Sequence, residues 1–295
     1  MTTYSIVIPA YNEHEVIQSL CARLKSVLSD IDGAAEVIFV NDGSSDQTSR
    51  ILDEIVDSDP RFRVVELSRN FGQQIAICAG LDHASGDAVI ILDADLQDPP
   101  ELIPQLIEAW QQGAEIVHAV RQEREGESIL KRFCAWVYYR LLNQLSELPI
   151  TSDAGDFRLI SRKVLLTIKA MNEHDPFLRG LFSWVGYRQT IVEFNRNGRY
   201  AGRSKYTVRK LLRLASSGIF GFSFAPLKVI GFGGGLVFVS GLAIMPFHAL
   251  PGIVLSSAGL QLCAIGVVGM YLRRILDEVR DRPRYVVAAK KGFPL

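Results

Sequence analysis

A cluster of carboxylates follows a short apolar run in the stretch Asp93-Ala94-Asp95-Leu96-Gln97-Asp98. Carboxylates this close together repel one another and raise each other's pKa, so we expect a cation beside them. Hard oxygen ligands of this kind suit Mg²⁺ or Mn²⁺, which would join the carboxylates to a diphosphate. A D-x-D triplet alone is more often a loop cap or a solvated turn. The stretch therefore predicts metal-dependent phosphate chemistry only if other polar residues converge on it.

Polar residues also follow two earlier apolar runs, at Tyr11-Asn12-Glu13 and at Asp42. The apolar runs and the segments between them alternate between strand and helix patterns. The predicted strands are Tyr4–Pro9, Glu36–Val40, Phe62–Leu67 and Ala88–Leu92, and the predicted helices are Glu13–Leu28, a segment ending at Val56, and Gln73–Ala84. This alternation predicts an α/β fold with a mostly parallel sheet flanked by helices, in which ligands bind beyond the carboxyl ends of the strands.

Each polar residue at these strand ends also has a purely structural interpretation. Asp42 could cap the next helix, and Pro9 could simply end its strand. Ser44 and Gln47 are spaced as a capping box for the same helix. The joint placement of polar residues after three strands favours a ligand site over three unrelated caps.

The composition describes a folded chain without a strong electrostatic preference. Of its 295 residues 48% are hydrophobic, and 32 Lys and Arg balance 32 Asp and Glu. No overall field therefore points to nucleic acid as a partner. The four cysteines are Cys21, Cys78, Cys134 and Cys263, too dispersed for a disulfide framework or a zinc site. The first residues lack the pattern of a signal peptide, so we expect a cytosolic N-terminus.

Two long uncharged runs, Val229–Ala249 and Gly252–Leu272, distinguish the other end of the sequence. Each would be about 31 Å long as a helix, enough to cross a hydrocarbon core of about 30 Å. Basic residues flank the pair on both outer sides, which predicts a hairpin with both ends in the cytosol and a short external turn at Leu250-Pro251. Two buried core helices are the alternative.

The predicted organisation has four parts. A cytosolic domain covers 1–205 and is followed by a segment, 206–226, in which basic and apolar residues alternate. That alternation predicts an amphipathic helix on the membrane surface. The two transmembrane helices fall within 227–272, and a cytosolic tail covers 273–295.

Several motifs resemble those of a known enzyme family. SIVIPAYNE (5–13), VNDGSSD (40–46) and LDADLQDPPE (92–101) together resemble the inverting family-two glycosyltransferases. LSRNFGQQIAICAGLDHASGD (67–87), DAGDFRLISR (153–162) and RYAGRSKYTVRKLLRL (199–214) resemble polyprenyl-phosphate sugar synthases, relatives of dolichol-phosphate mannose synthase. Within these, the similarity is greatest to bacterial bactoprenol glucosyltransferases and covers nearly the whole chain. It implies a nucleotide-sugar-binding domain of the glycosyltransferase A type with a C-terminal two-helix transmembrane hairpin.

The resemblance also implies roles for individual residues. It assigns the nucleoside to Pro9, Tyr11, Glu13 and Asp42, the nucleotide to Asp93, Ala94 and Asp95, and a Mg²⁺ or Mn²⁺ ion to Asp93, Asp95 and Gln97. Candidates to bind the donor and acceptor phosphates are Arg121, Arg132, Arg203 and Lys205, each of which could instead be a solvated surface charge. Asp156 corresponds to the presumed base. Pairing with Arg158 to hold the loop is an equally good interpretation of Asp156.

We therefore expect an enzyme that transfers one sugar, with inversion, from a nucleotide donor to polyprenyl phosphate such as undecaprenyl phosphate. UDP-glucose is the first choice of donor, and GDP-mannose, UDP-N-acetylglucosamine and an aminoarabinose donor stay open. We expect it in the inner cell membrane as a multi-pass protein, with the catalytic domain and both termini in the cytosol. A homo-oligomer stays open as well.

Three other functions are weighed against this one. A processive polysaccharide synthase typically carries a Q-x-x-R-W motif and more membrane spans than this sequence offers. A dinucleotide oxidoreductase is disfavoured because no G-x-G-x-x-G follows the first strand. A non-catalytic membrane scaffold that binds nucleotides would not need intact metal carboxylates, and here they are intact.

Overall fold

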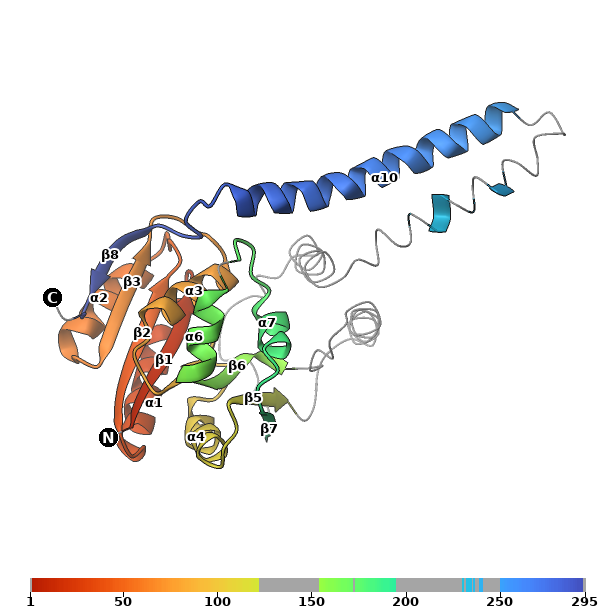
Figure 1. Ribbon diagram of the computed structural model, residues 1–295. Helices are drawn as coiled ribbons and strands as arrows, with labels where there is room; N and C mark the ends of the chain where they lie inside the picture. Colours follow the sequence, from red (N-terminus) through yellow and green to blue (C-terminus); the bar gives the residue numbers. More distant parts are fainter. Residues whose placement is uncertain are drawn as a thin grey trace. The chain divides into compact units, whose positions relative to one another are not determined.

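The computed structural model describes residues 2–121, 154–171, 173–194 and 250–293, with a few positions between 230 and 240 (Figure 1). The described residues belong to two units. One contains the sheet and includes residues from Pro283 onward, and the other contains helix α10.

The first unit is built on an eight-stranded sheet with the strand order β7-β5-β6-β4-β1-β2-β3-β8. The strands are β1 (Thr3–Ala10), β2 (Ala34–Asn41), β3 (Phe62–Leu67), β4 (Ala88–Ile91), β5 (Ile116–Arg121), β6 (Ala154–Ser161), β7 (Gln189–Phe194) and β8 (Val287–Lys291). β4, β1, β2 and β3 run parallel, as do β5 and β7. β6 runs antiparallel to both β4 and β5, and β8 runs antiparallel to β3.

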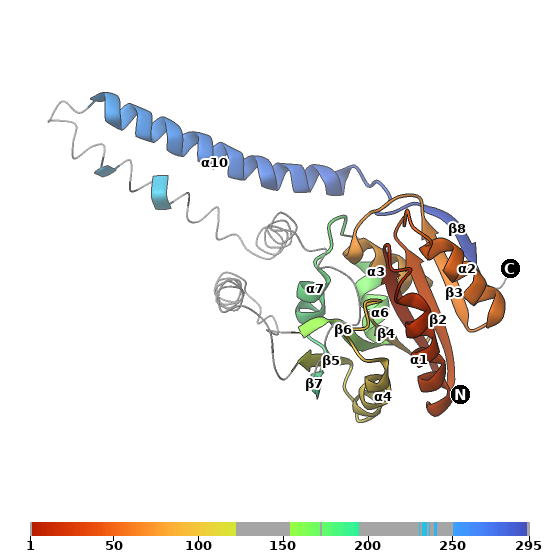
Figure 2. The ribbon, with the colours of Figure 1, turned by 180° about the vertical axis from the view of Figure 1, so that it is seen from behind.

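Helices cover both faces of the sheet (Figure 1, Figure 2). The helices of the first unit are α1 (Ile17–Asp30), α2 (Thr48–Ser58), α3 (Gln73–His83), the 3-10 turn η1 (Pro100–Leu102), α4 (Ile103–Gln111), α6 (Arg162–Ala170) and α7 (Leu178–Trp184). α1, α2 and α4 pack on one face, and α3 and α6 on the other. Because both faces are covered, the central strands are buried along almost their whole length, as in β1 and β4.

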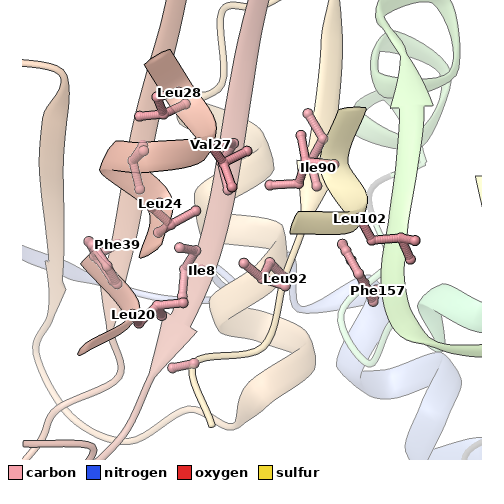
Figure 3. Packing of buried hydrophobic residues seen from close by; sticks show 14 of the residues in the cluster. Ile8, Leu20, Leu24, Val27, Leu28, Phe39, Ile90, Leu92, Leu102 and Phe157 are labelled. Carbon is pink, nitrogen blue, oxygen red and sulfur yellow. The ribbon is translucent and has the colours of Figure 1, made fainter. Parts of the chain in front are cut away.

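The main core fills the space between α1, η1, α4 and the sheet. Leu20 and Leu24 of α1 meet Ile8 and Phe39 of the strands, all of them fully buried (Figure 3). On the opposite face α3 lies close to β1, because Gly80 faces Val7. A Cβ at position 80 would lie 2.2 Å from Cγ1 of Val7, so only glycine permits this distance.

The predicted strands lie within three residues of the observed ones at every end, but two helix starts differ. α1 begins at Ile17 rather than at Glu13, whose carbonyl instead accepts the N–H groups of Val16 and Ile17. The predicted capping box of α2 is wrong. The N–H of Thr48, the first residue of α2, donates to Oδ1 of Asp46, whereas Ser44 Oγ accepts the N–H of Asn12.

The end of the chain contributes to the sheet, although residues 273–295 were predicted as a separate tail. β8 pairs Val65 of β3 with Lys290, and the N–H of Ser68 donates to the carbonyl of Val286. Lys291 Nζ also lies 2.5 Å from Oδ2 of Asp53. The residues that follow α10 therefore belong to the same sheet as β1.

The second unit contains α10 (Leu250–Val279), which includes the predicted span Gly252–Leu272. Its Ser257–Val279 part, 23 residues, is the one described helix long and apolar enough to cross a membrane. The external turn predicted at Leu250-Pro251 is wrong, because both residues belong to the helix. Proline is tolerated there because the first turn of a helix does not use its N–H groups. The predicted span 229–249 and the amphipathic segment 206–226 lie almost entirely outside the described residues.

Candidate active site

The candidate site lies at the edge of the sheet where the parallel strands β1, β2 and β4 end. β4 ends at Ile91, and Asp93 follows two residues later. β6 runs antiparallel to β4 and pairs Arg158 with Ile91, so Asp156 lies past the end of β4 on the same side. The reversed direction of β6 therefore brings Asp156 to the same edge as Asp93.

The side chain of Gln73 connects these two aspartates. Its Nε2 lies 2.9 Å from Oδ1 of Asp93 and 3.3 Å from Oδ2 of Asp156. The next residue, Gln74, also donates from Nε2 to Oδ2 of Asp156, at 3.3 Å. The first turn of α3 therefore faces both carboxylates.

Arg179 of α7 brings a positive charge to the same place. Its Nε lies 2.9 Å from Oδ1 of Asp156, whose side chain is only 5% exposed. The start of α7 is tied to α3, because Oε1 of Gln74 accepts the N–H of Leu178 at 3.3 Å. Asp156 thus accepts hydrogen bonds from three side chains, and both of its oxygens are engaged.

The two aspartates differ in their ionisation. Burial raises the pKa of Asp93 well above its ordinary value, and the carboxylates of Asp156, Asp98 and Asp95 raise it further. Burial acts on Asp156 in the same direction, but Arg179, together with Arg158 and the hydrogen bond from Gln74, brings the pKa of Asp156 below its ordinary value. The positive charge of Arg179 therefore does not neutralise all of the carboxylates around Asp93.

Asp95 and Gln97, the other predicted metal ligands, lie in the tight turn after Asp93. The N–H of Gln97 donates to Oδ1 of Asp95 at 3.1 Å, and Leu96 between them has a positive φ of 58°. Across the described residues no three His, Cys, Asp or Glu side chains are grouped to hold an ion by themselves. Mg²⁺ is usually held by one or two carboxylates together with substrate phosphates. The crowded carboxylates of Asp93 and Asp95 fit such a partial site.

Asp42 follows β2 and is only 2% exposed. Its Oδ1 accepts the N–H of Phe71 at 2.7 Å and its Oδ2 accepts the N–H of Gly72 at 2.9 Å. Burial raises the pKa of Asp42, and these two hydrogen bonds oppose that shift. Gly43, at φ 64°, packs against the same loop, where a Cβ would lie 2.4 Å from the carbonyl carbon of Arg69. Asp42 therefore holds the loop before α3 and does not cap the helix that follows it in the sequence, α2.

The other residues predicted to hold the nucleoside lie at the end of β1. Pro9 is within the strand, opposite Val40. Tyr11 is 37% exposed, so its ring is accessible at this edge. The N–H of Glu13 donates to Oγ1 of Thr48 at 2.9 Å, which fixes the loop after β1 to α2. The structure thus brings Pro9, Tyr11 and Glu13 to the same edge as the acidic residues.

This arrangement, acidic residues after β4 and polar loops after β1 and β2, occurs within residues 5–168, which match the family model for glycosyl transferase family 2. The match covers more than half of the chain. The chain belongs to glycosyl transferase family 2.

Two relatives illustrate the similarity. The glycosyltransferase is 45% identical to the uncharacterized glycosyltransferase YkcC of Bacillus subtilis, over 98% of this chain and 94% of the relative. It is 41% identical to the SfII prophage-derived bactoprenol glucosyl transferase of Shigella flexneri, over 98% of this chain and 99% of the relative.

A solved structure shows the same fold. The glucosyl-3-phosphoglycerate synthase of Mycobacterium tuberculosis, in complex with Mn²⁺, UDP-glucose and phosphoglyceric acid, superposes with a TM-score of 0.51 at 22% identity. The match covers 74% of this chain and 78% of that chain. The predicted mostly parallel α/β sheet of the glycosyltransferase A type is confirmed.

The residues predicted to bind phosphate are placed only in part. Arg121 is the last residue of β5, and its side chain lies outside the described residues, as do Arg132, Arg203 and Lys205. Their role stays a prediction.

Arg158 of the glycosyltransferase is fully buried but is not the nearest cation to Asp156. Its Nη2 lies 4.0 Å from Oδ1 of Asp156, farther than Arg179. It donates instead to two backbone carbonyls, from Nη2 to Gly155 at 2.6 Å and from Nε to Asp156 at 3.3 Å. Its guanidinium also lies over the ring of Phe182, 4.6 Å from the centroid. Arg158 therefore shapes the backbone around Asp156, while Arg179 balances the carboxylate.

Three residues of the site were not predicted from the sequence, namely Gln73, Gln74 and Arg179. They come from the starts of two helices rather than from strand ends, so the rule that ligands bind beyond strand ends does not find them. Gln73 and Gln74 do lie in a stretch that resembles the polyprenyl-phosphate sugar synthases, 67–87.

A hollow of about 370 Å³ lies away from these residues. It is lined by Thr2, Trp110, Gln111, Gly113, Ala114 and Glu115. Thr2 precedes β1, so the hollow lies at the edge where β1 begins, opposite the aspartates. We therefore place the active site at the aspartates and not in the hollow.

Proposed function

We propose that this glycosyltransferase transfers a single glucose from UDP-glucose to polyprenyl phosphate, with inversion at the anomeric carbon. The observation that carries the proposal is the 41% identity to the bactoprenol glucosyl transferase of Shigella flexneri, because it extends over 98% of this chain and 99% of the relative. A similarity of that extent includes the regions that would contact an acceptor as well as the donor domain.

The donor would bind at the edge where β1, β2 and β4 end. Asp93 and Asp95 would hold Mg²⁺ or Mn²⁺, with Gln97 beside them, and the ion would stabilise the charge on the departing diphosphate. Tyr11 offers an accessible ring to the nucleoside. Asp42 would contact the nucleoside as well as hold the loop before α3, because each of its oxygens accepts one backbone N–H and can accept a second hydrogen bond.

The acceptor brings its own nucleophile. A phosphate monoester has a second pKa of about 6, so its oxygen is largely ionised near neutral pH and needs no strong base. Asp156 is held by Arg179, Gln73 and Gln74, which suits a fixed negative charge that orients groups in the site. Arg121, Arg132, Arg203 and Lys205 would bind the phosphates.

The protein would be held at the cytosolic face of the inner membrane. α10 supplies one helix of sufficient length, and the uncharged run 229–249 would supply the second. Both ends of this hairpin carry basic residues, which favours the cytosol for the transferase domain and for both termini.

The proposal is tested by supplying purified full-length protein with undecaprenyl phosphate and, in separate reactions, radiolabelled UDP-glucose, GDP-mannose and UDP-N-acetylglucosamine. We expect label in the lipid extract with UDP-glucose and Mg²⁺ or Mn²⁺, and none when undecaprenyl phosphate is omitted. Label in a long polysaccharide would indicate a processive synthase. Lipid product from another donor would overturn the choice of glucose.

A further inference from the structure

We propose that Gln73 is a positioning residue that sets the spacing between Asp93, on the donor side of the site, and Asp156, on the acceptor side. The inference rests on the proposed function for the meaning of these two sides. Gln73 reaches both carboxylates from one nitrogen, at 2.9 Å and 3.3 Å.

The chemistry of the neighbours fixes the orientation of the Gln73 side chain. An ionised carboxylate only accepts hydrogen bonds, and a carboxamide nitrogen carries two hydrogens. One hydrogen can therefore point at Asp93 and the other at Asp156. The amide bridges two negative groups that would otherwise repel each other, and it holds each of them in one rotamer.

Gln74 makes a different set of contacts from the same helical turn. Its Nε2 donates to Asp156 and its Oε1 accepts the N–H of Leu178, so it joins α3 to α7 beside Arg179. It makes no hydrogen bond with Asp93 within the part of the chain that the structure describes. The two glutamines therefore share Asp156, while Gln73 alone of the pair reaches the donor side.

The backbone that carries these side chains is itself fixed. The N–H groups of Phe71 and Gly72 are bound by Asp42, and Gly80 in the middle of α3 packs against Val7 of β1. A rigid helix start makes a precise bridge possible, because side chains on a mobile loop would not hold both carboxylates at hydrogen-bonding distance.

The difference between the two glutamines gives the test. Gln73→Met keeps the length of the side chain and removes its donors. We expect it to lower kcat about 10- to 100-fold, the range for a lost positioning hydrogen bond. We also expect it to weaken the binding of Mn²⁺ with UDP by about 3- to 10-fold, because Asp93 loses its fixed rotamer. Gln74→Met should lower kcat but leave the binding of Mn²⁺ with UDP within about twofold of wild type.

Two further variants distinguish the loss of the Gln73 hydrogen bonds from a nonspecific effect of substitution on the protein. Gln112→Met changes an exposed glutamine at the end of α4 and should alter neither quantity. Gln73→Asn keeps an amide, but on a side chain too short to reach both carboxylates. It should lower kcat and the binding of Mn²⁺ with UDP as expected for Gln73→Met, and it replaces that variant in the test if Gln73→Met fails to fold. Thermal unfolding of each full-length variant identifies those that are folded.

Binding of Mn²⁺ with UDP is measured by isothermal titration and needs no acceptor. If wild-type protein transfers no glucose, the proposed function fails, yet the titration still decides the role of Gln73. The inference is overturned if folded Gln73→Met or Gln73→Asn binds Mn²⁺ with UDP as wild type does. It is also overturned if Gln74→Met weakens that binding as much as Gln73→Met.

Discussion

Two aspartates at one sheet edge have pKa values shifted in opposite directions, and their neighbours explain why. Asp156 is buried and Asp93 is half-buried, and desolvation raises the pKa of each, but Arg179 contacts Asp156 directly and only partly offsets the three carboxylates around Asp93. Asp93 is thus the group that gains most from an added cation, and Asp156 already has one. The two aspartates of one site therefore have different electrostatic surroundings, because Asp93 lies among other carboxylates and Asp156 is paired with Arg179.

The first prediction concerns the metal. Asp95→Asn keeps the shape of the side chain and removes a negative charge from the crowded turn. We expect it to abolish transfer while leaving the unfolding temperature within about 3 °C of wild type, because Asp95 is only partly buried. Excess chelator should inactivate wild-type protein until Mg²⁺ or Mn²⁺ is restored. Full transfer in chelator would contradict the metal site.

The second prediction concerns the ion pair of Arg179. Arg179→Met would leave the buried carboxylate of Asp156 without its nearest cation. Removing one partner of a buried pair costs about 3 kcal/mol of unfolding free energy. We expect a loss of that order in guanidinium unfolding of the full-length protein. Arg50→Met, which breaks the exposed pair with Glu54, is the matched control and should have little effect.

The third prediction concerns pH and the opposite edge of the sheet. Glu36 is buried, which raises its pKa, but hydrogen bonds from Ser5 and Ser85 and the charge of Arg63 bring the pKa below its ordinary value. Glu36 therefore stabilises the fold above its unfolded pKa of about 4.3, and this contribution is lost as pH falls through the lower folded pKa.

Glu36→Gln tests this sign. The variant should be less stable than wild type at pH 7 by about 1–3 kcal/mol, and its stability should fall less between pH 5 and 3 than that of wild type. Unfolding midpoints at several pH values measure both quantities. Glu54→Gln changes an exposed carboxylate and should follow the wild-type profile. An unchanged acid-side loss in Glu36→Gln would show that another group causes it.

At the scale of elements, the residues that follow α10 form a C-terminal clasp, defined here as 283–293. Besides β8, the Tyr285 hydroxyl donates to Oδ2 of Asp82 at 2.8 Å, and Arg284 lies 3.5 Å from the same oxygen. The ring of Phe293 meets His83, at a centroid distance of 5.6 Å. The clasp therefore contacts the C-terminal end of α3, the helix whose first turn carries Gln73 and Gln74.

The fourth prediction follows from the contacts of the clasp with β3 and α3. Deleting residues 283–295 exposes the edge of β3 and removes the partners of α3, so we expect aggregation or loss of the cooperative thermal transition. Tyr285→Phe removes a single hydrogen bond and should cost about 1 kcal/mol. Thermal unfolding of the full-length variants measures both. A truncated protein with wild-type stability and activity would show that the clasp is dispensable.

The sequence predicted the elements whose pattern is local. β1 to β4 are β-branched runs bounded by turn residues, and they were found within three residues of their ends. The strands β5 to β8 were not predicted. In β6 and β8 the residues AGDFRLIS and VAAKK have no strong strand pattern, and their partners in the sheet decide their conformation. Asp93 and Asp95 were predicted because they follow the apolar run of β4, and Asp156 was predicted only through the resemblance to a known family, whereas Gln73 and Arg179 depend on how helices pack.

At the scale of the whole molecule, the sheet restricts how the chain can cross a membrane. β7 ends at Phe194 and β8 begins at Val287, and both belong to one sheet. The chain therefore leaves this domain and returns to it on the same side of any membrane. The number of crossings between the two strands must be even. The proposed pairing of α10 with the uncharged run 229–249 agrees with an even number.

The fifth prediction tests this topology in intact cells. Reporters fused at Met1 and at Leu295 should both be cytosolic, since each is joined to the same sheet, and a reporter inserted before Leu250 should be external. Accessibility to a membrane-impermeant thiol reagent, at single cysteines placed in a cysteine-free variant, gives an independent measurement. An external Leu295 would be incompatible with the pairing of β8 and β3. A cytosolic position before Leu250 would instead mean that α10 does not cross, so the membrane would be bound from one face only.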